Sequence, residues 1–322
     1  MRAVVVDRYG PPEVARVRDV PDPAPRAGEV LVRVAAAAVT SGDARMRAGR
    51  FPRGFAVPAR VALGLRGPRR RVLGAVFSGD VVALGAGVTG VAVGDRVATM
   101  TGGSLGGHAE LAVVRADRIT PLPAGLPHDA AAAVLFGGAT ALDYLRTKAH
   151  LAAGATVLVN GASGAVGSSA VQVARHLGAE VTGVTSAANA DLVTRLGATR
   201  VVDHRTTTLA DVQARGERFD VVLDTVGNVS PAAGRRLLTR DGVVLLAVAG
   251  LGELLAARGP VKAGPASESP ALLAEVLRLT ADGVLDPLVE STHPLDGIAD
   301  AYRRVDSGRK VGNVLVRPQG AP

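Results

Sequence analysis

The stretch from residue 157 to residue 175 constrains this chain most, because spaced glycines separate an apolar run from a helical pattern. The apolar run 156–159 predicts a buried strand, and apolar residues recurring every three or four positions after the turn predict a helix. Between them lie Gly161, Gly164 and Gly167. Such a turn brings bare backbone N–H groups and a helix N-terminus up to a pyrophosphate, so the stretch predicts a dinucleotide-binding turn.

The glycine pattern departs from G-x-G-x-x-G at one position, where Ala162 replaces the first glycine. In a chain with 40 glycines, an ordinary strand-to-helix turn is the alternative interpretation. The following sequence favours the first interpretation, because strand-like and helix-like segments alternate at 180–186, 188–196, 200–202, 219–226 and 242–249. This alternation predicts an α/β fold with a doubly wound parallel sheet.

A different pattern precedes this region. Short runs with strand character, separated by Gly-rich or Pro-rich punctuation, occupy 2–7, 30–34, 77–84, 95–99 and 109–113 and predict a compact β domain. After a boundary near residue 121, helical spacing appears at 129–136 and 140–149. From Pro260 the sheet pattern stops, and a helix at 270–282 and a strand at 312–316 are predicted beyond it.

Composition sets the outer bounds. A chain of 322 residues with 48% hydrophobic content can bury a large core, and its length favours two domains. No apolar run approaches the ~20 residues that a membrane span needs, and the first seven residues open a strand, so we expect a soluble, cytoplasmic protein. The absence of cysteine excludes disulfides, thiolate nucleophiles and Cys-ligated metal centres.

The formal net charge of +8 comes mostly from arginine, and one segment, Arg45–Arg71, concentrates it. No acidic residue falls between Asp43 and Asp80. The segment is either a solvated surface, an attractor for an anionic substrate, or a nucleic-acid site. Single-stranded nucleic acids usually need stacking aromatics as well, and aromatic residues make up only 2% of this chain, which disfavours the last interpretation.

Several motifs together resemble the zinc-independent quinone oxidoreductase (zeta-crystallin-like) branch of the medium-chain dehydrogenase/reductase superfamily. They are RYGPPEV at 8–14, VTSGD at 39–43, LGAGV at 84–88, VGDRV at 93–97, GATA at 138–141 and NGASGAVG at 160–167. The resemblance implies a GroES-like catalytic domain at 1–121, a Rossmann NADPH-binding domain at 122–260 and a C-terminal return to the catalytic domain at 261–322. It also implies an active site in the cleft between the domains, and a homodimer.

The resemblance implies a reaction without metal. Where zinc-containing relatives place a cysteine and a Gly-His-Glu motif, this chain has TSGD at 40–43 and LGAVF at 73–77. Its six histidines are scattered without the short spacing of a metal site. Hydride transfer to an already polarised double bond, as in a quinone or an enone, needs no Lewis acid.

The end of the second Rossmann strand bears on cofactor choice. NAD-binding folds commonly carry a carboxylate there, whereas this chain has VTSAAN at 184–189. Ser186 and Asn189 can donate hydrogen bonds to a 2′-phosphate, and Arg205, next to His204, can supply a cation, so NADPH is the predicted cofactor. The alternative for Arg205 is a solvent-facing side chain.

The remaining cofactor contacts follow from the resemblance. Thr140 is placed toward the nicotinamide, with a helix N-cap as the alternative, and Lys310 could replace a lysine that relatives have where this chain has Asn313. The complete predicted set is Thr140, Gly161, Ala162, Gly164, Ala165, Val166, Gly167, Thr185, Ser186, Asn189, His204, Arg205, Thr225, Val248, Gly250, Lys310 and Asn313.

Proton transfer is the least defined part of the prediction. Tyr9, Thr40 and Asp43 match family positions around the cleft, although Asp43 could simply brace its loop and water could supply the proton. The predicted function is NADPH-dependent hydride transfer to a small quinone or α,β-unsaturated carbonyl compound, which could be anionic. The alternative is an NADPH-binding sensor or RNA-binding protein with little or no reductase activity.

Overall fold

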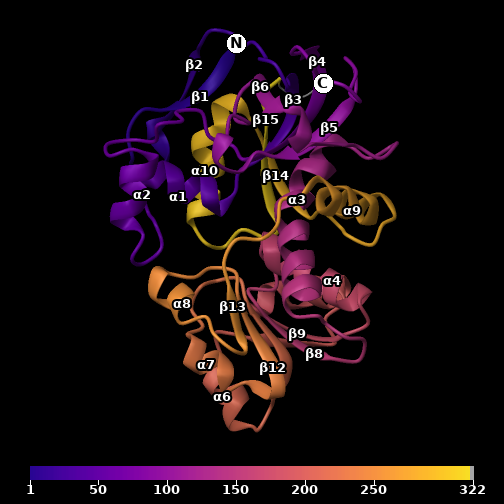
Figure 1. The fold of residues 1–322 in the computed structure, drawn as a ribbon. Helices are drawn as coiled ribbons and strands as arrows, with labels where there is room; N and C mark the ends of the chain where they lie inside the picture. Colours follow the sequence, from indigo (N-terminus) through magenta and orange to yellow (C-terminus); the bar gives the residue numbers. More distant parts are fainter. Residues whose placement is uncertain (320–322) are drawn as a thin grey trace.

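The computed structural model describes residues 1–319 and contains two large sheets, one above the other in Figure 1. The lower sheet is six-stranded and entirely parallel, in the order β10-β9-β8-β11-β12-β13. Its strands are β8 (Thr156–Asn160), β9 (Glu180–Thr185), β10 (Arg200–Asp203), β11 (Phe219–Asp224), β12 (Leu238–Leu246) and β13 (Val261–Ala263). The strand order reverses on either side of β8, as in a doubly wound Rossmann sheet, so the predicted fold class is confirmed.

Helices connect the parallel strands, as right-handed crossovers require. They are α4 (Ala165–His176), α5 (Ala190–Leu196), α6 (Leu209–Ala214), α7 (Pro231–Arg235) and α8 (Leu251–Leu255). Val157 of β8 pairs with Val181 on one side and Val221 on the other, and all three are buried. Because β8 is covered on both faces, its central residues can be apolar without alternation.

The upper sheet has seven strands and is mostly antiparallel: six follow the order β14-β15-β3-β4-β5-β7, and β6 pairs with β3 beside this path. Its strands are β3 (Glu29–Ala38), β4 (Val76–Leu84), β5 (Arg96–Met100), β6 (Leu111–Arg115), β7 (Ile119–Pro121), β14 (Val289–Pro294) and β15 (Asn313–Arg317). A separate hairpin pairs β1 (Arg2–Val6) with β2 (Ala15–Asp19). α10 (Ile298–Asp306) contacts β2 and α1 (Ser41–Ala48), and α2 (Ala56–Leu63) lies next to α1 in Figure 1. The C-terminal strands therefore complete a sheet that the N-terminal strands begin.

One long helix joins the two halves. α3 (His128–Leu142) passes directly into a π-helical segment (Asp143–Lys148), whereas the sequence predicts two separate helices. The expected break at Gly137 and Gly138 is wrong, because these glycines serve close packing. A Cβ on Gly137 would lie 2.3 Å from the carbonyl oxygen of Ala165 in α4, and one on Gly138 would lie 2.6 Å from Val276 in α9 (Pro270–Ala281).

The sheet does not stop at Pro260, as the sequence pattern suggests. Val261–Ala263 form β13, which pairs in parallel with β12 through Val244–Val261. Three residues are too few to show a periodic pattern, so only the pairing partner reveals this strand. In the described part of the chain, no helix has the length and apolar character that crossing a bilayer requires.

Candidate functional site

A cavity of about 1050 Å³ opens where the carboxyl ends of β8, β9, β10 and β11 face the upper domain. Four parts of the chain line it: the loops after these strands, the segment around Thr40 at the start of α1, Phe136 on the helix between the two sheets, and the C-terminal segment from Arg304 to Asn313. The carboxyl edge of a parallel sheet at its point of strand-order reversal is where open α/β folds bind ligands. The cavity therefore coincides with the predicted dinucleotide site.

The glycine turn forms one wall of this cavity and needs glycine for two reasons. Gly161 has φ +85°, a left-handed conformation, and a Cβ there would lie 2.6 Å from the hydroxyl oxygen of Thr225. A Cβ on Gly167 would lie 2.0 Å from the Gly161 carbonyl oxygen. Gly164 differs, because a Cβ there would meet only the Gly161 oxygen, at 3.5 Å, and would otherwise project into open space.

This geometry leaves the start of α4 exposed to a ligand. Gly164 is the N-cap of the helix, and Ala165 and Val166, which begin it, line the cavity. Helix geometry leaves the first N–H groups without intrahelical acceptors and gives this end partial positive charge. An anionic diphosphate fits such a surface.

Ala162, the departure from the glycine pattern, points away from the cavity. Its side chain is fully buried, and a Cβ on Gly183 of β9 would lie only 3.1 Å from the Ala162 Cβ. The extra methyl group is therefore accommodated by a glycine on the neighbouring strand. The sequence pattern alone did not show this compensation.

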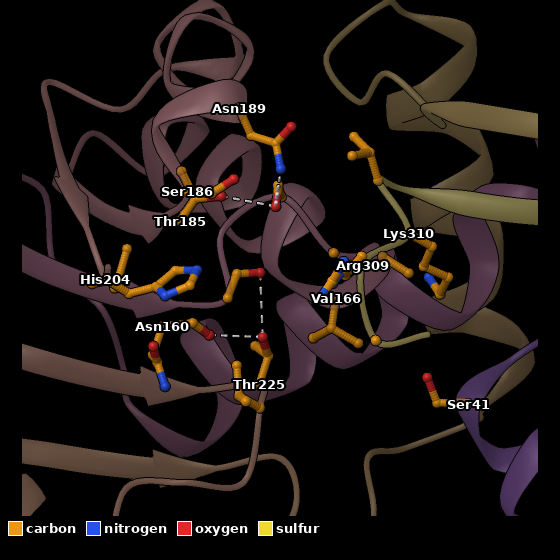
Figure 2. Close-up of a pocket in the computed structure, with 18 of the residues that line it drawn as sticks. Ser41, Asn160, Val166, Thr185, Ser186, Asn189, His204, Thr225, Arg309 and Lys310 are labelled. Carbon is orange, nitrogen blue, oxygen red and sulfur yellow. Dashed lines mark hydrogen bonds between the residues drawn. The ribbon is translucent and has the colours of Figure 1, made fainter. Parts of the chain in front are cut away.

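Polar side chains gather at the far end of the cavity, beyond β9. The hydroxyl of Thr185 and the amide of Asn189 both donate to the hydroxyl oxygen of Ser163, at 2.9 and 3.1 Å (Figure 2). Ser186 lies beside them, and His204 faces the same space from the end of β10. Sequence reasoning missed Ser163, although its place inside the glycine turn was a usable signal.

The loop after β11 is held by one buried carboxylate. Asp224 accepts hydrogen bonds from the backbone N–H groups of Val226 and Val229, each at 2.9 Å, and from the side-chain amide of Asn160 at the same distance. Thr225 donates to the Asn160 carbonyl oxygen at 2.7 Å (Figure 2). These bonds fix Thr225 and Val226 against the glycine turn.

The C-terminal segment closes the cavity from the opposite side. The N–H of Gly312 donates to the Ser163 carbonyl oxygen at 2.8 Å, so this segment touches the glycine turn directly. Lys310 lines the cavity and donates to the Gly312 carbonyl oxygen (Figure 2). Burial, and to a smaller extent nearby Arg304, lower the pKa of Lys310 to about 8 against the opposing effect of Glu290.

Asn313 also borders the cavity but is committed elsewhere. It is buried at the start of β15, and its side-chain amide donates to the Pro287 carbonyl oxygen at 2.7 Å. The amide therefore anchors the strand. The family resemblance implies a lysine at the position of Asn313, and Lys310 is the cation of this segment that lies nearest to it in the sequence.

Of the three residues predicted for proton transfer, Thr40 lines the cavity. It caps α1, and its hydroxyl donates to the Asp43 carboxylate at 2.6 Å. Asp43 is 3% exposed and also accepts from the backbone N–H groups of Thr40, at 2.9 Å, and Gly74, at 3.1 Å. Its hydrogen bonds are those of the loop brace that the sequence left open as an alternative.

Tyr9 lies outside the cavity and is already paired. Its hydroxyl donates to the Gly64 carbonyl oxygen at 2.7 Å, its ring contacts Phe51 edge-on, and the Arg60 guanidinium lies over it at 5.4 Å. Burial raises the pKa of Tyr9. These contacts hold Tyr9 against α2 and the segments on either side of it.

Thr140 also lies outside the cavity. It sits within α3, so the N-cap alternative is wrong, and its hydroxyl donates to the carbonyl oxygen of Phe136 one turn earlier, at 2.7 Å. Phe136 itself lines the cavity, whereas Thr140 is 7% exposed. The GATA segment therefore shapes the helix behind the cavity wall.

A second cavity of about 650 Å³ adjoins the first. Ser41, Arg45 and Val226 line both, so the two cavities share part of their wall at the start of α1. Val248 and Gly250, predicted to bind the cofactor, line only this second space.

The structure thus divides the predicted cofactor set. Lining the first cavity are Gly161, Gly164, Ala165, Val166, Thr185, Ser186, Asn189, His204, Arg205, Thr225, Lys310 and Asn313. Ala162 and Gly167 shape the turn from behind, and Thr140, Val248 and Gly250 lie elsewhere. The polar lining residues that the sequence reasoning missed are Ser41, Arg45, Asn160, Ser163, Thr207, Thr208, Asn228, Arg304 and Arg309.

Comparison with known proteins matches both halves of the chain to families. Residues 26–124 match an alcohol dehydrogenase GroES-like domain, and residues 196–316 match a zinc-binding dehydrogenase family. The quinone oxidoreductase of Pongo abelii is 29% identical over 332 residues, which cover 96% of this chain and 94% of that protein. The Escherichia coli quinone oxidoreductase complexed with NADPH superposes with a TM-score of 0.84 at 25% identity, covering 99% of this chain and 100% of the other.

A further relative is much longer. Polyketide synthase GfsB of Streptomyces halstedii is 35% identical over 273 residues, which cover 80% of this chain but only 5% of that protein. The chain thus spans nearly the full length of the quinone oxidoreductase and a small part of the polyketide synthase.

The GroES-like half, the Rossmann half and the cavity between them define an oxidoreductase of the medium-chain dehydrogenase/reductase superfamily. Within that superfamily, the chain belongs to the quinone oxidoreductase (zeta-crystallin-like) branch.

Proposed function

We propose that this protein is an NADPH-dependent reductase that transfers hydride to a small quinone or α,β-unsaturated carbonyl compound without a metal ion. The observation that carries the proposal is the glycine turn at Gly164, which opens into a cavity that has a second one next to it at Ser41. The first cavity suits a dinucleotide, and the second suits an acceptor next to it. Bound NADPH supplies the hydride; the protein's contribution is binding and orientation.

The residues present fit a dinucleotide phosphate. The start of α4 would hold the diphosphate, and Ser186, Asn189 and the exposed Arg205 are donors for a 2′-phosphate. The relative from Escherichia coli that superposes on this chain is complexed with NADPH, which supports the same cofactor here. One hydrogen bond to a charged group contributes about 1.5–3 kcal/mol, enough for a preference of about tenfold or more.

The donor set does not fit a catalytic zinc ion. Within residues 1–319 no group of three or more His, Cys, Asp or Glu side chains is arranged to hold a metal. At the family position of the zinc ligand, Thr40 and Asp43 are hydrogen-bonded to each other. The proposed reaction therefore uses no metal ion, because a quinone or enone acceptor is already polarised without one.

For the proton that follows the hydride, we propose water as the donor. Tyr9 donates to Gly64, and Asp43 is bonded to Thr40 and Gly74, so both side chains are committed to holding the loops of the upper domain. Thr40 stays at the cavity wall, where its oxygen can orient the acceptor.

We also propose that the protein resides in the cytoplasm and assembles as a homodimer. The resemblance of the whole chain to quinone oxidoreductases supports both statements, and analytical ultracentrifugation tests the homodimer.

Two measurements test the proposed function. Fluorescence titration should show that NADPH binds at least about tenfold more tightly than NADH, because the 2′-phosphate meets donors and no carboxylate. NADPH consumption is then followed across a panel of quinones, enones and enoyl thioesters. Saturable binding without turnover of any acceptor would overturn the proposal and would favour a sensor.

A further inference from the structure

Arg45 is the one arginine of α1 whose charge the fold leaves open to a ligand. Arg47, from the same helix, and Arg50, just beyond the end of that helix, both pair with Asp306, at 2.5 Å. Arg45 precedes both in the sequence and has no such pairing: within residues 1–319, its burial and the like charge of Arg50 both lower its pKa. No carboxylate of the described chain offsets this guanidinium.

The position of Arg45 is specific. It lies one helical turn after Ser41, and both residues line the two cavities where they meet. The turn that would hold the diphosphate is on the opposite wall, in the lower domain. Arg45 therefore faces the part of the site where an acceptor, rather than the phosphates of the cofactor, would lie.

The other charges around the second cavity are accounted for. Asp306 is shared by Arg47 and Arg50, and the Glu253 carboxylate accepts from the Gly250 N–H at 2.8 Å in the cap of α8. Arg53 also borders this cavity, but it is exposed, so water screens its charge. A half-buried cation without a partner is costly until an anion reaches it.

The rest of the second cavity suits a compact apolar body. Phe51, Pro52 and Val248 line it, and Val226, which is 50% exposed, stands at the junction. These apolar side chains, next to the half-buried Arg45 guanidinium, match a ligand with an unsaturated ring or chain and one acidic group. Guanidinium groups bind carboxylates through two parallel hydrogen bonds.

We propose that Arg45 binds a carboxylate on the hydride acceptor and thereby selects acidic quinones or enones over neutral ones. This inference rests on the proposed function, because it takes the second cavity as the acceptor site. It makes Arg45 a specificity-determining residue: the ion pair orients the acceptor at the junction of the cavities, and no bond is made or broken at the guanidinium.

The test uses a matched pair of compounds, 3-(1,4-benzoquinonyl)propanoate and its methyl ester, which share the reacting ring and differ in charge. Affinities are measured by calorimetry for the full-length protein with and without NADP⁺, and kcat/KM is measured with NADPH. The wild-type protein should prefer the acid at least about tenfold in both measurements. Arg45→Gln should lose this preference while binding the ester and NADPH as the wild type does.

Two further variants make the test specific. Arg45→Lys should retain part of the preference, because it keeps the charge but not the paired geometry. Arg53→Gln should retain all of it, since Arg53 is solvated. Equal affinity of the wild type for acid and ester, or a preference that survives in Arg45→Gln, would overturn the inference.

The outcomes also separate this inference from the proposed function. Consumption of NADPH with the ester at the same rate as with the acid would support the proposed reductase and would contradict the proposed anion site. Tighter binding of the acid without consumption of NADPH would support the anion site and remove the reductase.

Discussion

The two walls of the cavity are built in different ways. The wall of the lower domain consists largely of backbone: a glycine turn and the first N–H groups of α4, presented by β8. The wall of the upper domain consists of side chains from α1, chiefly Thr40, Ser41 and Arg45. We call the first the backbone wall and the second the side-chain wall. The ligand contacts of the backbone wall depend on positions without side chains, whereas those of the side-chain wall depend on which polar groups are not already hydrogen-bonded to one another.

The largest effect should come from filling the backbone wall. Gly164→Val should leave the fold intact, since a Cβ there meets only one atom, at 3.5 Å, but should weaken NADPH binding by about 100-fold or more because the diphosphate loses its approach to α4. Fluorescence titration and thermal unfolding measure both effects. Gly103→Val, at a glycine with open space around it, is the control. Undiminished NADPH affinity in Gly164→Val would show that the cofactor binds elsewhere.

A smaller effect should follow from the charge of Lys310. Its pKa is lowered to about 8 by burial, so the free protein loses this proton as the pH rises through that value, and NADPH should then bind about tenfold more weakly. Titrations on both sides of this pH measure the change. The Lys310→Met variant should bind NADPH weakly at all pH values. The Lys262→Met variant, with its change on the outer strand β13, should show the same pH dependence of NADPH binding as the wild type.

The side-chain wall offers a sharper contrast at Asp43. Asp43→Asn should lower the free energy of unfolding by about 1–3 kcal/mol, because the amide cannot accept all of the bonds from Thr40 and Gly74. Denaturant unfolding measures this loss. The kcat for a quinone should stay within about threefold, whereas a proton donor would lose about 10²–10⁴-fold.

The smallest effect is expected at Tyr9. Tyr9→Phe removes one hydrogen bond to the Gly64 carbonyl oxygen, and kcat/KM should change by less than about twofold, since the hydroxyl is outside both cavities. Steady-state kinetics with NADPH and an enone measure it. A loss of about a hundredfold or more would restore Tyr9 as the proton donor.

Sequence patterns predicted more of the wall in the lower domain than of the wall in the upper domain. The parallel strands and the turn at Gly161 follow from apolar runs and glycine spacing, which are local properties. The role of Gly137 in packing and the presence of the short β13 could not be predicted this way, because each depends on a neighbour distant in the sequence. The N-cap alternative for Thr140 was wrong for a related reason, because the hydrogen bond of this residue lies in the interior of a continuous helix.

By itself, the sequence determined the fold class, the family and the position of the glycine turn, because alternating periodicity and missing side chains are written into the order of residues. The tertiary structure decided which polar groups are free. Asp43 and Arg47 are bonded within the fold, whereas Arg45, two residues from each, faces the junction of two cavities. The availability of a charge depends on partners that only folding brings within reach, and for that reason composition alone could not single out Arg45.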